Sequence, residues 1–189
     1  ASRLTGARIH FDVSSVGATG NVMMAAALAR GTTVIQNAAI EPEITALARF
    51  LVSMGGKIQG IGTNRLEIQG VDELHPAEAE TIPDRIEAGT FLVAGAMTRG
   101  SVLLERVDPG HLTAIITKLE EAGCTVSTTP TTVSLTSPEE LRPVNVTAEI
   151  YPGFPTDMQA QWTALMTMAK GASVITDTIY LDRFKHVPE

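Results

Sequence analysis

The chain has 189 residues, a length that allows one large domain or two small ones, each with its own hydrophobic core. With 14 Lys and Arg against 21 Asp and Glu, the formal net charge is -7, which argues against a nucleic-acid-binding protein with a broad cationic surface. The single cysteine, Cys124, excludes an internal disulfide framework and a Cys-based structural zinc site, and suits a reducing cytoplasm.

The ends of the chain and its hydropathy give no sign of targeting or of a membrane span. The longest apolar stretch, residues 22–29, is far shorter than the roughly 20 residues that a bilayer-spanning helix needs. The first ten residues contain no apolar signal core. The chain does not begin with Met, and its last residues read like the entrance to a further helix, so we expect a fragment of a longer protein.

The first third of the chain predicts a small α/β module. We expect a strand over 7–12, a helix over about 18–29, a strand over 32–36, a helix over about 42–54, and a hairpin pairing 57–61 with 65–69. The second helix has an apolar stripe at helical spacing, formed by Ile44, Leu47 and Leu51, with charged residues opposite. It should therefore cover a sheet and face water.

The same order of elements recurs further along. We expect a helix from residue 85, a strand over 101–105, a helix over 110–122, and strands over 124–128 and 132–136. Three segments share an apolar helix, a glycine and a β-branched strand, and the glycines are Gly31, Gly100 and Gly171, spaced by 69 and 71 residues. The sequence therefore predicts an α/β (α+β) fold of repeated βαβαββ units, with a third unit that is cut short.

The two helices of each predicted unit differ in polarity. Residues 18–29 and 90–98 carry no charged side chain, so these first helices should be enclosed, with helices inside and sheets outside. Glycines stand where helix ends favour a left-handed residue: Gly31, Gly55, Gly100, Gly123 and Gly171. The charged, proline-containing stretch 72–83 predicts a domain boundary near residue 80, and residues 141–145 mark a second break.

Four segments depart from simple packing, and three of them have two interpretations. Residues 14–19 join a strand to an apolar helix and form either an anion-binding turn or an ordinary helix cap. Glu41-Pro42-Glu43 is typical of a helix start, and capping alone explains it. Asp84-Arg85 is either a cap or a ligand-binding pair. Asp157 is either a helix cap or a cleft carboxylate that acts as a general base toward a hydroxyl.

Other catalytic patterns are absent from the sequence. The four histidines, at positions 10, 75, 111 and 186, lack metal-ligand spacing, and there is no Gly-rich phosphate loop or nucleophile elbow. Cys124 follows a glycine at the start of a strand, so a small core residue is the favoured interpretation over a nucleophile.

Six motifs together resemble the UDP-N-acetylglucosamine enolpyruvyltransferase (1-carboxyvinyltransferase) family. They run in family order over nearly the whole chain: SVGAT (15–19), GTTVIQNAA (31–39), EPEI (41–44), PDRIEAGTF (83–91), PGFPTDMQAQ (152–161) and YLDRFKHVPE (180–189). The resemblance implies an inside-out α/β barrel of the enolpyruvyltransferase type, here only partial. Residues 1–81 would be the last βαβαββ unit of one domain, and residues 82–189 the first unit and the start of the second unit of the other.

The resemblance also implies roles for individual residues. Asp157 matches the aspartate that holds the sugar 3-hydroxyl and is the catalytic base of the family. The matching substrate-binding positions are Ser15, Val16, Gly17, Glu41, Arg85, Ile179, Tyr180 and Arg183. Ile40 and Val13 depart from the family pattern, at positions where an Arg and a Lys are frequent, so the nucleotide contacts are less well matched than Asp157. The resemblance leads us to expect that the catalytic cysteine loop of the family belongs to segments outside residues 1–189.

The implied activity is transfer of enolpyruvyl from phosphoenolpyruvate to UDP-N-acetylglucosamine, without a metal or other cofactor. It would make a peptidoglycan precursor in the bacterial cytoplasm, and so serve cell wall biogenesis, cell shape and cell division. The partners would be the two substrates and the missing remainder of the same enzyme, with no nucleic acid or membrane. Two alternatives stay open: a catalytically silent fragment that binds the UDP-sugar or serves only as scaffold, and a distant relative of enolpyruvylshikimate-phosphate synthase or RNA-phosphate cyclase.

Overall fold

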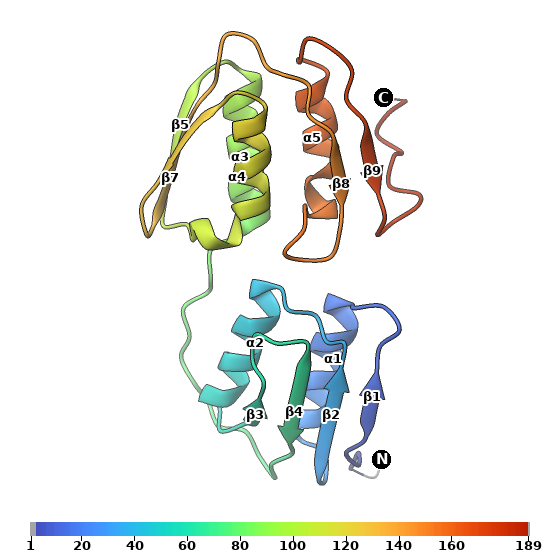
Figure 1. The fold of residues 1–189 in the computed structure, drawn as a ribbon. Helices are drawn as coiled ribbons and strands as arrows, with labels where there is room; N and C mark the ends of the chain where they lie inside the picture. The colour runs from blue at the N-terminus through green and yellow to red at the C-terminus, as the bar shows by residue number, and fades with distance from the viewer. Residues whose placement is uncertain (1–2, 189) are drawn as a thin grey trace. The chain divides into compact units, whose positions relative to one another are not determined.

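A computed structural model describes residues 3–188 of the chain. The chain divides into two compact units, Ala1–Ile82 and Pro83–Glu189, and each unit has its own hydrophobic core (Figure 1). The two units are described in turn.

The first unit contains the six predicted elements in the predicted order. They are β1 (Arg8–His10), α1 (Val16–Ala27), β2 (Thr32–Gln36), α2 (Pro42–Ser53), β3 (Lys57–Gln59) and β4 (Arg65–Gln69). The sheet has the strand order β1-β2-β4-β3, in which β1 runs parallel to β2 and the other pairs are antiparallel. The hairpin register, with Ile58 opposite Ile68, matches the pairing expected from the sequence.

One face of this sheet is buried beneath the two helices, as Figure 1 shows. Alternating residues of β2 and β4, namely Ile35, Leu66 and Ile68, are almost fully buried. They pack in one cluster with Met23 of α1 and Ile44 of α2. The period of two in the strands and the helical stripe of α2 thus meet in a single apolar layer.

The second unit begins with α3 and is built around a three-stranded sheet. Its elements are α3 (Arg85–Met97), β5 (Ser101–Glu105), the 3-10 turn η1 (Pro109–His111), α4 (Thr113–Glu121), β6 (Thr125–Thr128), β7 (Thr132–Thr136), β8 (Val146–Ala148), the 3-10 turn η2 (Thr156–Met158), α5 (Gln159–Met166) and β9 (Ile175–Asp177). The sheet order is β5-β7-β6, all antiparallel, and β8 pairs with β9 in parallel. No strand is assigned between β4 and α3, residues that the structure describes, so the second copy of the βαβαββ plan lacks its first strand.

The core of the second unit joins the three-stranded sheet to α5. Leu92 of α3, Ile115 of α4 and Val133 of β7 belong to one cluster with Trp162, the single tryptophan. Trp162 is fully buried, and its Nε1 donates to the backbone carbonyl of Val144 at 3.4 Å. This packing holds α5 in place, and the candidate catalytic residue lies in η2, the turn directly before that helix.

Two expectations from the sequence need correction. Within the described residues the first helices are not fully enclosed, because Met24 of α1 and Phe91 of α3 are 46% and 54% exposed. Gly100 does not have a positive φ, since the preceding Arg99 takes the left-handed conformation, with φ 53°. Gly55 and Gly123 do adopt positive φ directly after the C-cap residues of α2 and α4, as predicted.

Candidate active site

Asp157 lies in the 3-10 turn that precedes α5, and its side chain is half exposed. Its Oδ1 accepts a hydrogen bond from Nη2 of Arg183 at 2.6 Å, and 52% of the side chain is open to solvent. Neither η2 nor α5 has a side-chain cap. Of the two interpretations from the sequence, helix capping by Asp157 is therefore wrong, because its carboxylate pairs with Arg183 instead.

The second nitrogen of the same guanidinium begins a partly buried series of hydrogen bonds that ends at Asp177. Nη1 of Arg183 donates to Oγ1 of Thr156 at 3.0 Å, and that hydroxyl donates to Oδ2 of Asp177 at 2.6 Å. The Asp177 side chain is buried, with 7% of the residue exposed. Arg183 therefore bridges two carboxylates, Asp157 directly and Asp177 through a threonine hydroxyl.

Asp177 also organises the loop that follows β9. Its Oδ1 accepts the backbone N–H groups of Ile179 and Tyr180 at 2.8 and 2.9 Å. Burial raises the pKa of Asp177, but the Thr156 hydroxyl, these two N–H groups and the charge of Arg183 outweigh that effect and hold the pKa below its usual range. Asp177 is thus an ionised, fully bonded carboxylate at the base of the loop.

The loop after β9 brings the candidates Ile179 and Tyr180 close to the ion pair of Asp157 and Arg183. The guanidinium carbon of Arg183 lies 5.3 Å from the centroid of the Tyr180 ring, within range of a cation–π contact. The Tyr180 residue is 58% exposed. The structure therefore brings together four of the residues singled out in the sequence: Asp157, Ile179, Tyr180 and Arg183.

Sequence analysis missed the role of Asp177 and of the Thr156 hydroxyl. The available signal was local: an aspartate at the end of a β-branched strand, where its side chain can accept the N–H groups two and three residues ahead. Its link to Thr156 joins residues 21 positions apart, and no local pattern predicts such a contact.

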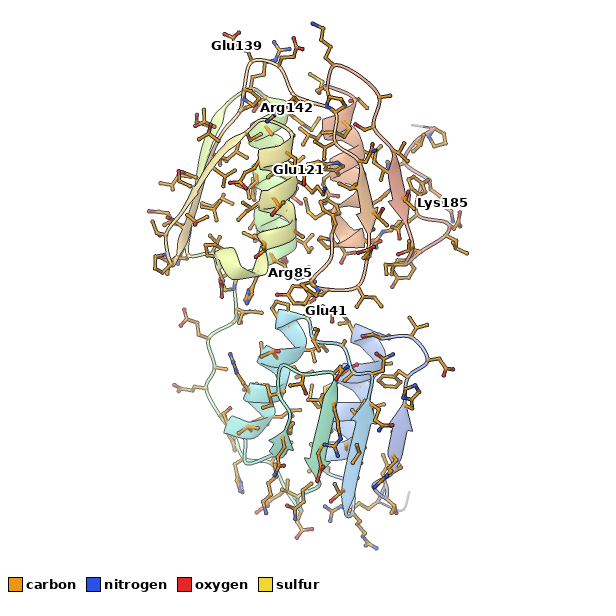
Figure 2. All side chains as sticks on the ribbon, in the orientation of Figure 1. Glu41, Arg85, Glu121, Glu139, Arg142 and Lys185 are labelled. Atoms are coloured by element: carbon orange, nitrogen blue, oxygen red, sulfur yellow. The ribbon has the colours of Figure 1, made fainter. Side chains whose placement is uncertain are left out.

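Arg85 is the first residue of α3, at the position labelled in Figure 2. The preceding Asp84 accepts the N–H groups of Ile86 and Glu87 at 2.7 and 3.1 Å, so the cap interpretation is confirmed for Asp84. The Arg85 guanidinium carbon lies 5.4 Å from the centroid of the Tyr151 ring. These two side chains line a shallow hollow of the second unit, together with residues of η1, the first turn of α4 and the loop before η2.

In the first unit, three candidates form the start of α1. Oγ of Ser15 accepts the N–H of Ala18 at 3.3 Å, which confirms its role as helix cap. Val16 and Gly17 form the first helical positions, and a Cβ placed on Gly17 would meet nothing within 4 Å. Ser15 thus caps α1, and the space beside Gly17 where a side chain would stand is open.

Glu41 directly precedes α2, where Figure 2 labels it. Its carbonyl accepts the first helical N–H groups, but its side chain makes no capping hydrogen bond and the residue is 8% exposed. The segment before it is tied to α1, because the buried Thr19 accepts the N–H of Ala39 at 2.9 Å. The expected start of α2 at Pro42, with the acidic Glu43 in its first turn, is confirmed.

Among residues 3–188, no group of three or more His, Cys, Asp or Glu side chains is placed to hold a metal ion. Within the same residues, no helix is both long enough and apolar enough to cross a membrane. Cys124 is buried in the core of the second unit, and burial raises the pKa of its thiol, which disfavours the reactive thiolate.

Comparison with known proteins identifies relatives over the whole chain. Residues 1–189 match the family described as EPSP synthase (3-phosphoshikimate 1-carboxyvinyltransferase). The UDP-N-acetylglucosamine 1-carboxyvinyltransferase of Chloroherpeton thalassium is 62% identical over 186 residues, which are 98% of this chain and 43% of that protein. The protein of the same name from Chlorobium limicola is 58% identical over 99% of this chain and 44% of its own length.

Solved structures confirm the fold class. The enolpyruvyl transferase NikO from Streptomyces tendae has a TM-score of 0.88 and 26% sequence identity, and the match covers 100% of this chain and 48% of NikO. An EPSP synthase from Acinetobacter baumannii has a TM-score of 0.64 over 98% of this chain and 44% of that one, and at 23% identity it bears on the fold alone. The chain thus spans less than half the length of the relatives that it matches.

Proposed function

The chain belongs to the enolpyruvyl transferase family described as EPSP synthase (3-phosphoshikimate 1-carboxyvinyltransferase), and we propose that it forms part of a UDP-N-acetylglucosamine 1-carboxyvinyltransferase. The relatives at 54–62% identity that carry this name support the choice of acceptor substrate. The proposed reaction transfers the enolpyruvyl group of phosphoenolpyruvate to the 3-hydroxyl of UDP-N-acetylglucosamine and releases phosphate, by addition and elimination.

The observation that carries this proposal is the half-exposed carboxylate of Asp157, held by Arg183 at 2.6 Å. A positioned carboxylate can accept the proton that the attacking hydroxyl loses as its oxygen bonds to the enolpyruvyl carbon. Arg183 fixes the direction of this carboxylate and keeps a positive charge beside it. The proposed catalytic base is therefore Asp157, and the reaction needs no cofactor.

The remaining candidates are proposed as substrate contacts. Ser15, Val16 and Gly17 form the N-terminal end of α1, where N–H groups and the helix dipole favour an anion such as the diphosphate of a UDP-sugar. We assign Ile179 and Tyr180 to the sugar nucleotide. Glu41 and Arg85 are assigned to the substrate site without a more specific role. We assign residues 1–81 and residues 82–189 to units of two different domains.

The proposal covers a whole enzyme of which the chain supplies one part. Because the relatives are more than twice as long, we propose that turnover also requires segments found in them, including the general acid and most cations for phosphoenolpyruvate. The enzyme would act in the bacterial cytoplasm on a peptidoglycan precursor, with consequences for cell wall biogenesis, cell shape and division. A single buried, unpaired cysteine suits that compartment.

Calorimetry of the 189-residue chain with UDP-N-acetylglucosamine tests the proposal. We expect heat of binding with the native chain and a loss of affinity of about tenfold in Asp157→Ala, as expected for removal of one charged hydrogen-bonding partner. The same titration with shikimate 3-phosphate tests the alternative that the family description raises. Binding of shikimate 3-phosphate alone would overturn the choice of substrate, and no binding of either would leave a scaffold role.

Phosphate release measures the other half of the proposal. The chain is mixed with both substrates, and we expect no turnover above the uncatalysed background, whether or not the UDP-sugar binds. Turnover at a normal enzyme rate, on the order of 10 per second, would contradict the assignment of the general acid to other segments.

A further inference from the structure

We propose that Thr156 and Asp177 are positioning residues, which anchor Arg183 from the protein interior so that the same guanidinium presents its other nitrogen to Asp157. The inference rests on the proposed function only in the role that it gives Asp157. It is carried by three contacts: Arg183 to Thr156, Thr156 to Asp177, and Arg183 to Asp157.

The direction of each hydrogen bond in this series follows from which side chains can only donate and which can only accept. A guanidinium has only donors, so the Thr156 oxygen must accept from Arg183. The Thr156 hydroxyl proton is then free to point elsewhere, and the oxygen 2.6 Å away is Oδ2 of Asp177, a carboxylate that can only accept. The polarity runs one way, from the Arg183 cation through a neutral hydroxyl to the Asp177 anion.

The two ends of this series of hydrogen bonds differ in their exposure to solvent. Asp177 uses both oxygens, Oδ2 for Thr156 and Oδ1 for the N–H groups of Ile179 and Tyr180, and it is buried. Asp157 has 52% of its side chain exposed and lies at the solvent end. A ligand hydroxyl that takes up the Asp157 carboxylate would therefore leave Arg183 anchored through Thr156.

The same carboxylate fixes the loop that carries the other candidates. Because Asp177 holds the N–H groups of Ile179 and Tyr180, it sets the path of the backbone toward Arg183. The Arg183 guanidinium then lies over the Tyr180 ring. One buried carboxylate thus determines the placement of three proposed substrate contacts, and a buried charge is costly unless its partners are this complete.

The test follows the Arg183 side chain by NMR in the 15N-labelled chain without ligand. We expect separate Nη1 and Nη2 signals in the native chain, because both nitrogens are held, and Arg183→Lys identifies them by their loss. Thr156→Val, which keeps the shape but removes the hydroxyl, should merge the two signals by rotation. Thr156→Ser restores the hydroxyl and should restore the two signals.

Two further variants distinguish the two ends of the hydrogen-bond series, Asp157 and Asp177. Asp157→Asn should leave the Nη1 signal in place, since Thr156 and Asp177 remain. Asp177→Asn keeps one acceptor oxygen for the loop but loses a carboxylate, so it should release Arg183 while the amide signals of Ile179 and Tyr180 persist. It replaces Thr156→Val if that variant fails to fold. Release of Arg183 by Asp157→Asn and not by these variants would overturn the proposal.

Ligand titration supplies a readout that a merely structural role would not move. Thr156→Val should weaken UDP-N-acetylglucosamine binding about tenfold, and Thr156→Ser less than about twofold. Equal affinities in the two variants would overturn the positioning role. If the native chain does not bind the sugar nucleotide, the proposed function fails, and the NMR comparison still decides this inference.

Discussion

Nη2 of Arg183 lies 2.6 Å from Oδ1 of Asp157, across 26 positions of sequence. The two residues come from different loops of the second unit, one before α5 and one after β9. The hydrogen bond from Arg183 orients the carboxylate of Asp157. A change at Arg183 should therefore alter the chemistry of Asp157 while the fold of the unit stays intact.

The first prediction concerns Arg183→Lys. A lysine ammonium is a single point charge and cannot reach both Thr156 and Asp157 as the planar guanidinium does. We expect UDP-N-acetylglucosamine affinity to fall about tenfold by calorimetry, with the midpoint of urea unfolding nearly unchanged, because 36% of the Arg183 side chain is exposed.

Lys185→Ala is the matched control for Arg183→Lys. Lys185, labelled in Figure 2, is another cation of the same segment, and its ion pair with Asp182 is exposed. Its loss should leave the affinity unchanged within a factor of about two, since exposed ion pairs contribute little. An equal loss of affinity in both variants would mean that any change of a cationic side chain in this segment weakens binding, and that the geometry of Arg183 does not account for the effect.

The second prediction is an acid dependence of stability from Asp177. Its pKa is lowered in the folded chain, so the stabilisation is present above the pKa of the unfolded residue, about 3.9, and is lost as the pH falls through the lower folded pKa. Asp177→Asn should be less stable than the native chain at pH 7, and that difference should shrink below about pH 4. Urea unfolding followed by Trp162 fluorescence measures it.

Asp72→Asn provides the control for this acid dependence. The pKa of Asp72 is also lowered, through its hydrogen bond and charge interaction with Arg3, but 95% of its side chain is exposed. Such a surface pair should change the unfolding free energy little at either pH. A pH dependence in Asp177→Asn that matches the native chain would contradict the contribution assigned to Asp177.

Local pattern predicts the elements of the first unit and most of those of the second, but it does not predict β8 or the links between distant residues. The strands over 32–36 and 101–105 have the bounds that the sequence predicts, because in both segments a short run with β-branched residues follows a glycine at a helix end. The bridge from Arg183 through Thr156 to Asp177 depends on where two loops meet in space, which no period in the sequence reports. Arg99 likewise takes the left-handed position expected of Gly100, since the tertiary path of the chain outweighs residue preference there.

The third prediction compares two glycines at the fifth position of corresponding helices, Gly89 in α3 and Gly20 in α1. A Cβ at Gly89 would lie 2.8 Å from Cδ1 of Ile115 and 3.1 Å from Sδ of Met158, the residue after Asp157. Both atoms stand at the ends of side chains that can shift, but Ile115 and Met158 are fully buried, so Gly89→Ala should cost about 1 kcal/mol of unfolding free energy, the low end of the range for overpacking.

Gly20→Ala is the control, because its Cβ would make only ordinary contacts, at 3.5 Å from Leu47 and 3.7 Å from Ile44. It should stabilise the first unit by up to about 1 kcal/mol, the helix-propensity difference between Gly and Ala. Urea unfolding monitored by far-UV circular dichroism reports both units. If Gly89→Ala proves as stable as Gly20→Ala, the close packing of α3 against α4 and Met158 is contradicted.

The fourth prediction concerns the thiol of Cys124. The residue is 6% exposed in the core beside Leu119 and Val133, and burial raises the pKa of the thiol, so less thiolate is present at a given pH. We expect a thiol reagent at pH 8 to label the native chain on the order of 100-fold more slowly than the urea-unfolded chain, because reaction requires opening of the core.

An exposed reference thiol comes from Ala79→Cys in the Cys124→Ser background, since residue 79 is exposed. Labelling of native Cys124 at the rate of this reference would show that the core around α4 opens readily. It would also weaken the structural basis for Asp157, because the same core holds Trp162 and the start of α5.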